Sequence, residues 1–239
     1  MVVIALDASH SPGSVALARG GDLVASDRFG EGASHLVGLG QTVDGLLAAH
    51  SLSPRDIDRV ALVAGPGSFT GLRIALAWVK GLHAALGIDV VTVGTLELLA
   101  LPFLHETSPV CAMIDARRGE VYGALYRARN GTDGPPCFMA EEVIAPVAAD
   151  PEQFLASVGG ETALFVGTGA AAYRSLLDVP ARARARYIID EPGMFPSTPH
   201  LASVAHHLEP LVHDRIGALE PVYLRAAGAT RTRLGPLRP

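Results

Sequence analysis

The sequence predicts an α/β protein built from two similar lobes, and three observations indicate this fold class. The 239 residues are 49% hydrophobic and 18% charged, which is typical of a compact chain with its own core. Residues 1–93 read as three strands followed by alternating helices and strands. Leu6-Asp7-Ala8 then recurs as Ile114-Asp115-Ala116, again ahead of a turn and a strand. A match this short leaves chance and internal duplication equally open.

The opening strands are predicted from short apolar runs that are separated by turn residues. Val2–Leu6 is almost wholly apolar and rich in β-branched side chains, as in a strand that is covered on both faces. Residues 14–19 and 23–28 read as two further strands around the turn Gly20-Gly21-Asp22. The chain therefore begins with a predicted meander of three strands.

The first predicted helix spans residues 34–50, with Ser34 as its N-cap. Its apolar side chains recur at helical spacing, at Leu36, Leu39, Val43, Leu46 and Leu47. Glycines at positions 38, 40 and 45 oppose a helix, because each costs about 0.8–1 kcal/mol relative to alanine. Three such glycines predict a packing reason, such as another helix lying very close.

The remaining elements complete the α/β pattern. A strand at residues 59–64 leads through a loop at 65–70 into a helix at 72–86, and a strand follows at 90–93. The second half predicts helices at 151–158, 169–177 and 198–208, and strands at 164–166 and 187–189.

The glycine-rich loop is the most informative segment. It joins a strand to a helix, where free N–H groups and the positive end of a helix dipole favour a phosphate or carboxylate. It is not a Walker A loop, because no Lys-Ser/Thr pair follows its last glycine. The alternative is a tight turn that packs the helix on the sheet. The candidate nucleotide or phosphate residues are Asp7, Gly65, Gly67, Ser68, Thr70, Gly71 and Arg73.

The helix after this loop is apolar on every face, so something must cover it all round. Either it is a central core helix under the second lobe, or another protein covers its outer side. Together with the glycine-containing helix it predicts a docking surface, although the exposed face of the later helix stays open. The candidate interface residues are Leu36, Leu39, Val43, Phe69, Ile74, Trp78 and Lys80.

Several other functions are disfavoured. Lys and Arg number 19 against 24 Asp and Glu, a net charge of −5, which argues against binding nucleic acid by bulk electrostatics. The nine histidines include no His-x-x-x-His pair, so no metal site is predicted. Ser68 lacks a Gly-x-Ser-x-Gly elbow, which disfavours a serine hydrolase or peptidase. The apolar start is too short for a membrane span, and we expect a cytoplasmic protein.

The loop Gly65–Arg73 with Lys80-Gly81-Leu82 resembles the TsaB (YeaZ) family, as do Leu6–Ser9, Asp115–Tyr122 and Pro221–Arg225. This resemblance implies an actin-like ATPase (sugar kinase/Hsp70/actin) fold with two duplicated βββαβα lobes. It implies a role in tRNA threonylcarbamoyladenosine formation with the catalytic subunit TsaD and the ATPase TsaE, and a homodimer when the chain is alone. Contact with tRNA is expected only through the complex, and ATP or ADP only at the joint with the partner.

The resemblance also implies that this chain does not catalyse on its own. The catalytic relative has two metal-binding histidines in the segment that matches residues 91–99, and here those places hold Thr95 and Leu99. Glu97 is retained. Ala8 stands where the family commonly has threonine, and Trp78 is larger than the residues expected there. A free-standing actin-fold ATPase or phosphotransferase using Asp7 is the alternative.

The predicted domains follow from the same comparison. Residues 1–100 form the first lobe with its docking helices, and residues 197–225 are expected to pack back on it. Residues 101–196 form a second, degenerate lobe. Residues 226–239 form a basic tail, whose default interpretation is a solvated terminus.

Overall fold

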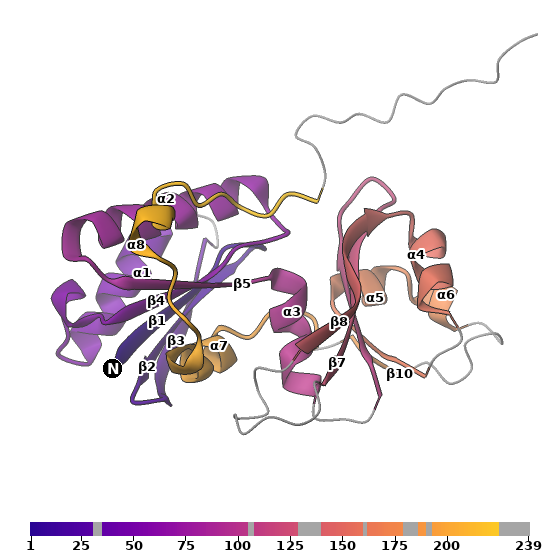
Figure 1. Ribbon diagram of the computed structural model, residues 1–239, viewed down its shortest axis with the longest axis horizontal. Helices are drawn as coiled ribbons and strands as arrows, with labels where there is room; N and C mark the ends of the chain where they lie inside the picture. Colours follow the sequence, from indigo (N-terminus) through magenta and orange to yellow (C-terminus); the bar gives the residue numbers. More distant parts are fainter. Residues whose placement is uncertain are drawn as a thin grey trace, which may run out of the picture.

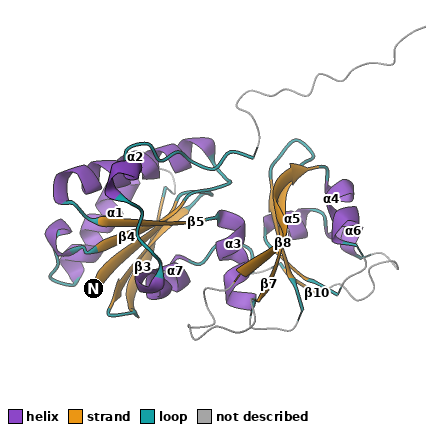
Figure 2. Cartoon of the chain, in the orientation of Figure 1, coloured by secondary structure: helices purple, strands orange, loops and turns teal. Residues whose placement is uncertain are grey.

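The computed structural model describes residues 1–30, 35–104, 108–128, 140–159, 162–178, 186–189 and 193–224, with side chains at 35–37 left aside. Two five-stranded sheets lie side by side, with helices on their outer sides and between them (Figures 1 and 2). No helix in these ranges is long and apolar enough to cross a membrane.

The first sheet has the order β3-β2-β1-β4-β5, antiparallel among β1 to β3 and parallel from β1 to β5 through β4. Its strands are β1 (Val2–Asp7), β2 (Gly13–Arg19), β3 (Asp22–Phe29), β4 (Arg59–Val63) and β5 (Asp89–Val93). The predicted meander and the two later strands are confirmed. The parallel pairs need crossovers, and the two long helices supply them.

The long helices α1 (His35–Ala49) and α2 (Phe69–Leu86) cover one face of this sheet. Side chains along β1 alternate, since Ile4 and Leu6 point into the core beneath these helices while Val3 and Ala5 point to the other face. The α2 helix begins three residues before the predicted start because the side chain of Ser68 accepts a hydrogen bond from the Gly71 amide and caps it.

The second sheet repeats the first. Its order is β10-β9-β6-β7-β8, so the strands, taken along the chain, occupy the same places as β1 to β5. They are β6 (Val110–Asp115), β7 (Val121–Ala128), β8 (Ala140–Ala149), β9 (Leu164–Val166) and β10 (Arg186–Ile188). The predicted duplication and the actin-like α/β class are confirmed. The β8 strand was not predicted, because half-exposed residues and Pro146 blur its pattern.

Short helices complete the two lobes. One core joins the inner faces of both sheets, with α3 and α7 packed into it. The outer face of the second sheet has its own core under α4. The short helices are α3 (Thr95–Ala100), α4 (Pro151–Val158), α5 (Thr168–Ala172), α6 (Arg174–Leu177), α7 (Thr198–Val204) and α8 (His213–Ile216), with single 3₁₀ turns at Pro54–Asp56, Leu101–Phe103 and Ala205–His207.

The chain returns to the first sheet after its second lobe. The α7 helix packs on β1 and β2, and residues 208–224, here called the C-terminal strap, then run along α2 (Figure 1). Backbone hydrogen bonds tie the strap down, from the Leu211 amide to the Val90 carbonyl and from the Val222 amide to the Ala64 carbonyl. The strap therefore forms part of the surface beside α2.

Candidate docking surface and glycine loop

The glycine loop packs against the backbone that follows β1. A Cβ at Gly67 would lie 2.4 Å from the Ser9 carbonyl oxygen, and one at Gly71 only 2.1 Å from the Ala8 carbonyl oxygen. The Ser68 amide donates to the Ser9 oxygen at 2.7 Å. These glycines are therefore explained by close contact between two backbone segments, and the amides of Ser68 and Gly71 already have partners within the chain.

Asp7 lies at the end of β1 and is fully buried. Its Oδ1 accepts the Ser9 amide at 2.7 Å, and its Oδ2 lies 3.0 Å from Nδ1 of His10. Apart from this contact with the imidazole, Oδ2 is buried and has no hydrogen-bond partner among the described residues.

The seven candidate phosphate residues differ in their exposure to solvent. Thr70 and Arg73 are exposed, whereas Asp7, Gly65 and Gly71 are buried. Gly65 has a φ of +112°, and a Cβ there would meet the Val222 carbonyl oxygen of the strap at 2.8 Å. In this conformation the glycines of the loop are accounted for by contacts within the chain, and the phosphate-loop interpretation stays a prediction. The geometry fits the alternative, a tight turn that packs α2 on the sheet.

Two of the predicted interface residues are in the core. Leu39 and Val43 are 0% and 1% exposed and lie between α1 and the sheet, so they cannot contact a partner. Their spacing marked the buried face of α1 and not its outer face. Leu36 falls outside the described side chains. Ile74, Trp78 and Lys80 are half-buried, and Phe69 is 43% exposed.

The structure shows which face of α2 is exposed. Thr70, Arg73, Ala77, Gly81 and Ala84 follow one another at steps of three or four residues, and all are exposed. The opposite side of α2 is buried on the sheet. We call these five residues, with Gly40, Asp44 and Ala48 of α1, the outer α1–α2 face.

The glycines of α1 and α2 have different causes, and only Gly40 and Gly81 among them belong to the outer α1–α2 face. Gly38 lies against Phe29 and Gly30, and Gly40 lies 4.0 Å from the Trp78 indole nitrogen. A Cβ at Gly45 or Gly81 would meet nothing within 4 Å. A glycine in a helix interior lowers helix stability by about 1 kcal/mol relative to alanine. At Gly45 and Gly81 the described residues make no contact that would compensate this loss. For Gly81, which lies on the outer α1–α2 face, close packing against a helix of another molecule would compensate this cost.

An aromatic and cationic cluster stands at the amino end of α2. The guanidinium carbon of Arg73 lies 3.8 Å above the ring of Phe69, and its Nε donates to the Tyr223 hydroxyl at 2.9 Å. Phe69 and Arg73 were predicted from the sequence as candidate site residues, and Tyr223 was not. Tyr223 is 150 residues away in the chain, so no local pattern connects it with Arg73.

The segment that the resemblance aligns with a metal-binding site lies between the lobes. Thr95 and Leu99 of α3 are each 1% exposed, and Leu99 belongs to the core that joins the two sheets. The Thr95 hydroxyl is buried and has no described hydrogen-bond partner. Among the residues that the structure describes, no three His, Cys, Asp or Glu side chains are grouped to hold a metal ion.

Glu97 on the same helix gives a pH-dependent prediction. Burial raises its pKa above the ordinary 4.5, and the nearby charge of Glu142 adds to this. The folded state therefore favours protonated Glu97, and stability present below about pH 4.5 is lost as the pH rises through the raised pKa. We expect Glu97→Gln to be more stable than the parent at neutral pH, by a margin that grows between about pH 4 and pH 8.

Urea unfolding across this pH range measures the difference in the free energy of unfolding between the two proteins. The exposed Glu209→Gln is the control, and equal margins for both variants would contradict the prediction.

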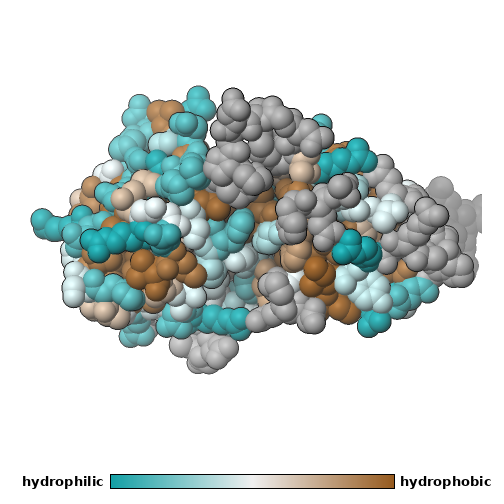
Figure 3. All heavy atoms as spheres, turned by 90° about the horizontal axis from the view of Figure 1, so that it is seen from below, coloured by the Kyte–Doolittle hydropathy of each residue, from teal (hydrophilic) through white to brown (hydrophobic). Residues whose placement is uncertain are grey.

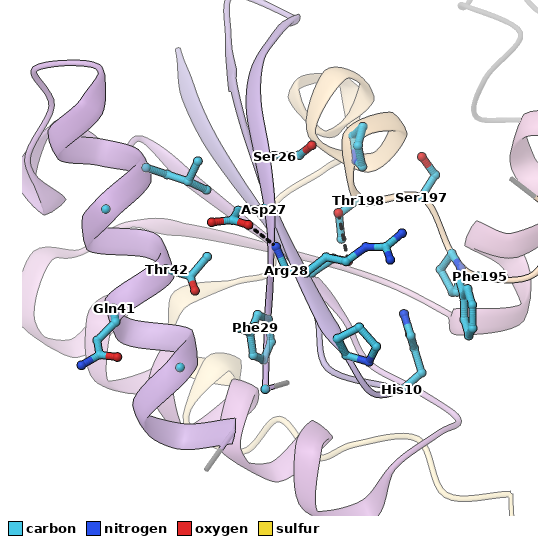
Figure 4. Close-up of a pocket in the computed structure, with 18 of the residues that line it drawn as sticks. His10, Ser26, Asp27, Arg28, Phe29, Gln41, Thr42, Phe195, Ser197 and Thr198 are labelled. Atoms are coloured by element: carbon cyan, nitrogen blue, oxygen red, sulfur yellow. Dashed lines mark hydrogen bonds between the residues drawn. The ribbon is translucent and has the colours of Figure 1, made fainter. Parts of the chain in front are cut away.

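A cleft of about 1030 Å³ opens beside the edge strand β3. In Figure 4, Arg28, His10, Phe195 and Thr198 line one side of it, and Gln41 and Thr42 of α1 lie on the other. The His10 and Phe195 rings stack at 4.7 Å between centroids. No local sequence pattern predicts this cleft, because its walls come from three segments that are distant in the chain. Elsewhere, the face shown in Figure 3 carries hydrophobic patches among hydrophilic residues.

Comparisons with known proteins agree with one another. A family model described as TsaD, tRNA N6-adenosine threonylcarbamoyltransferase, matches residues 31–228. The tRNA threonylcarbamoyladenosine biosynthesis protein TsaB of Haemophilus influenzae is 30% identical over 230 residues, 94% of each chain. TsaB of Bacillus subtilis is 34% identical over 131 residues, 55% of this chain and 57% of that one. The structure of YeaZ from Pseudomonas aeruginosa matches with a TM-score of 0.72 and 28% identity, over 93% of this chain and 99% of that one.

Proposed function

The chain belongs to the TsaB (YeaZ) family and so to tRNA threonylcarbamoyladenosine biosynthesis, and from this premise we propose that it is a non-catalytic subunit that docks on a TsaD-like catalytic subunit. The docking surface is the outer α1–α2 face. The exposed residues of these two helices support the proposal, whereas Leu39 and Val43 are buried under α1 and take no part in it.

The observation that carries this proposal is the exposed row of small residues on α2. Ala77, Gly81 and Ala84 leave a flat strip along a helix of 18 residues, and Gly81 has open space above it. Small residues let the backbone of a second helix approach closely, which fits a helical partner. The same strip would pair two copies of this chain when the partner is absent, since a self-complementary face supports a symmetric dimer.

Two features support a non-catalytic role. Leu99 and Thr95 are packed in the core between the lobes, where they offer neither an imidazole ligand nor an open coordination position. Asp7 is enclosed by Ser9 and His10, which does not fit an independent phosphotransferase. A nucleotide of the assembled complex is therefore proposed at the joint with the partner, and TsaE is proposed to join there.

Contact with tRNA is proposed to be indirect and to take place in the cytoplasm. The net charge of −5 does not favour a sequence-independent grip on a phosphate backbone. The catalytic subunit would then hold the tRNA, while this chain holds the catalytic subunit in its active arrangement.

The proposal is tested by placing a bulky, charged side chain on the row of small residues on α2. We expect Ala77→Arg to weaken binding to the TsaD-like subunit by at least about 100-fold, because a close helix has no room for the side chain and its charge loses water. Isothermal titration calorimetry measures the affinity, and the threonylcarbamoyladenosine content of tRNA measures function. The matched control is Ala156→Arg, at an exposed position of α4 in the second lobe.

Three outcomes decide the proposal. Loss of binding and of modification with Ala77→Arg but not with Ala156→Arg supports it. Unchanged affinity in both variants would mean that the surface is wrong. No complex between the parent proteins, together with ATP turnover that Asp7→Asn abolishes, would support the phosphotransferase instead.

A further inference from the structure

The cluster of Phe69, Arg73 and Tyr223 has features of a preformed binding site, and it stands at one end of the outer α1–α2 face. Phe69 is 43% and Tyr223 39% exposed, while the neighbouring Val222 is 42% exposed. All three belong to the large apolar side chains that are exposed in the described ranges. An exposed aromatic pair that flanks a cation is costly to leave in water and is typical of the centre of an interface.

The geometry holds Arg73 in one orientation. Its guanidinium lies 3.8 Å from the centre of the Phe69 ring and 5.9 Å from that of Tyr223, and the two rings are 5.3 Å apart. The Tyr223 hydroxyl accepts a hydrogen bond from Nε at 2.9 Å. A fixed arginine loses less conformational entropy on binding than a free one, so this arrangement lowers the entropic cost of binding.

The remaining donors define the ligand. Nε of Arg73 donates the hydrogen bond to Tyr223, and the two Nη groups take no part in that bond. Since the phenol oxygen accepts that bond, its own proton stays available for donation. Two Nη groups and a phenol proton are a set that suits a planar carboxylate, which takes two parallel hydrogen bonds from a guanidinium.

The surroundings favour a protein carboxylate over an RNA phosphate. RNA binding generally needs several cations along a path of phosphates. Here the neighbours of Arg73 on α2 are Thr70 and Ala77, the strap adds Val222, and Lys80 donates to the Gly217 carbonyl at 2.8 Å. Within the ranges that the structure describes, one stacked cation between apolar side chains matches an acidic side chain that is itself flanked by apolar residues.

We propose that Phe69, Arg73 and Tyr223 anchor the interface, by binding an Asp or Glu carboxylate of the catalytic partner to Arg73 while apolar partner residues cover Phe69 and Val222. This inference rests on the proposed function and adds the chemistry of the matching group. It also makes the interface composite, because the C-terminal strap supplies two of the exposed side chains. The strap thereby links the last described segment of the chain to complex formation.

The experiment compares variants in their affinity for the intact TsaD-like subunit. Arg73→Gln removes the charge, Arg73→Lys keeps the charge without the planar fork, and Tyr223→Phe removes only the hydroxyl. We expect Arg73→Gln to weaken binding by about 30-fold, Arg73→Lys by about tenfold and Tyr223→Phe by about threefold. The control is Arg55→Gln, an exposed arginine before β4, at the opposite end of that strand from the glycine loop.

A double-mutant cycle tests the positioning role of Tyr223. If its hydroxyl acts through Arg73, then Tyr223→Phe has little further effect in the Arg73→Gln background. Two independent losses that simply multiply would contradict this coupling. Thermal unfolding of each variant checks that the fold is retained, as expected for exposed side chains.

The outcomes separate this inference from the proposed function. If Ala77→Arg abolishes the complex while Arg73→Gln leaves the affinity within about twofold, docking stands and the anchor is wrong. If Arg73→Gln affects only self-association of the chain, the occupant is a second copy. If it affects only tRNA binding by the isolated chain, the occupant is a phosphate. Each of the last two results overturns the carboxylate assignment.

Discussion

Gly71→Ala is expected to destabilise the chain by at least about 2–3 kcal/mol, although alanine normally favours a helix. The added Cβ would lie 2.1 Å from the Ala8 carbonyl oxygen and 3.2 Å from the Ser68 Oγ that caps α2. The first contact is with backbone, which cannot rotate away. Relief requires α2 to move off the sheet, with loss of packing against β1 and β4. Urea unfolding of the isolated chain measures the change.

The same helix provides the matched control. Gly81 has open space around its Cβ position, so Gly81→Ala is expected to stabilise the chain by about 0.5–1 kcal/mol through helix propensity alone. The two substitutions are chemically identical and differ only in their surroundings. If both variants shift stability in the same direction, the close contact between α2 and Ala8 does not govern the loop.

A second large loss of stability is expected from Arg59→Met. Arg59 is 7% exposed, and its Nη1 donates to the carbonyls of Ala205 and Leu208 at 2.9 and 2.8 Å. Its Nη2 contacts the Asp89 carboxylate at 3.3 Å. Methionine fills much of the volume but leaves these acceptors without a donor. We expect a loss of about 2–4 kcal/mol, tempered by the partial exposure of Asp89.

This variant has a local signature as well as a global one. The two carbonyls belong to the turn that leads from α7 into the C-terminal strap. Limited proteolysis should therefore cut the strap sooner in Arg59→Met than in the control Arg55→Met. Equal cutting of both variants, with unchanged unfolding midpoints, would show that Arg59 does not hold the strap.

The effects also bear on docking. A loosened strap carries Tyr223 away from Arg73, so Arg59→Met should weaken partner binding although Arg59 itself lies inside the lobe. The loss should be no larger than that of Arg73→Gln. Partner binding would then depend on how firmly the strap is held, because the strap carries Tyr223 of the proposed interface.

Much of the architecture could be predicted from the chain itself. Apolar runs marked β1, β4 and β5, because burial of both sheet faces requires continuous apolar strands, whereas the exposed edge strand β3 was marked by the turn before it. The repeat of Leu6-Asp7 as Ile114-Asp115 indicated the duplication that the two sheets confirm. The glycine loop and the family resemblance likewise needed only local sequence.

What the tertiary structure decided is the direction in which each side chain points and which distant segments meet. Helical spacing marks an apolar stripe but cannot say whether the stripe faces the chain's own sheet or a partner, which is why Leu39 and Val43 were misplaced and Ala77 and Gly81 were overlooked. The local sequence of the glycine loop predicts an anion site, and only the tertiary structure shows the backbone of Ala8 and Ser9 packed against Gly71 and Gly67. Tyr223 reaches Arg73 only because the chain returns across α2 after its second lobe. Such contacts depend on packing over long sequence separations, and local sequence patterns do not encode them.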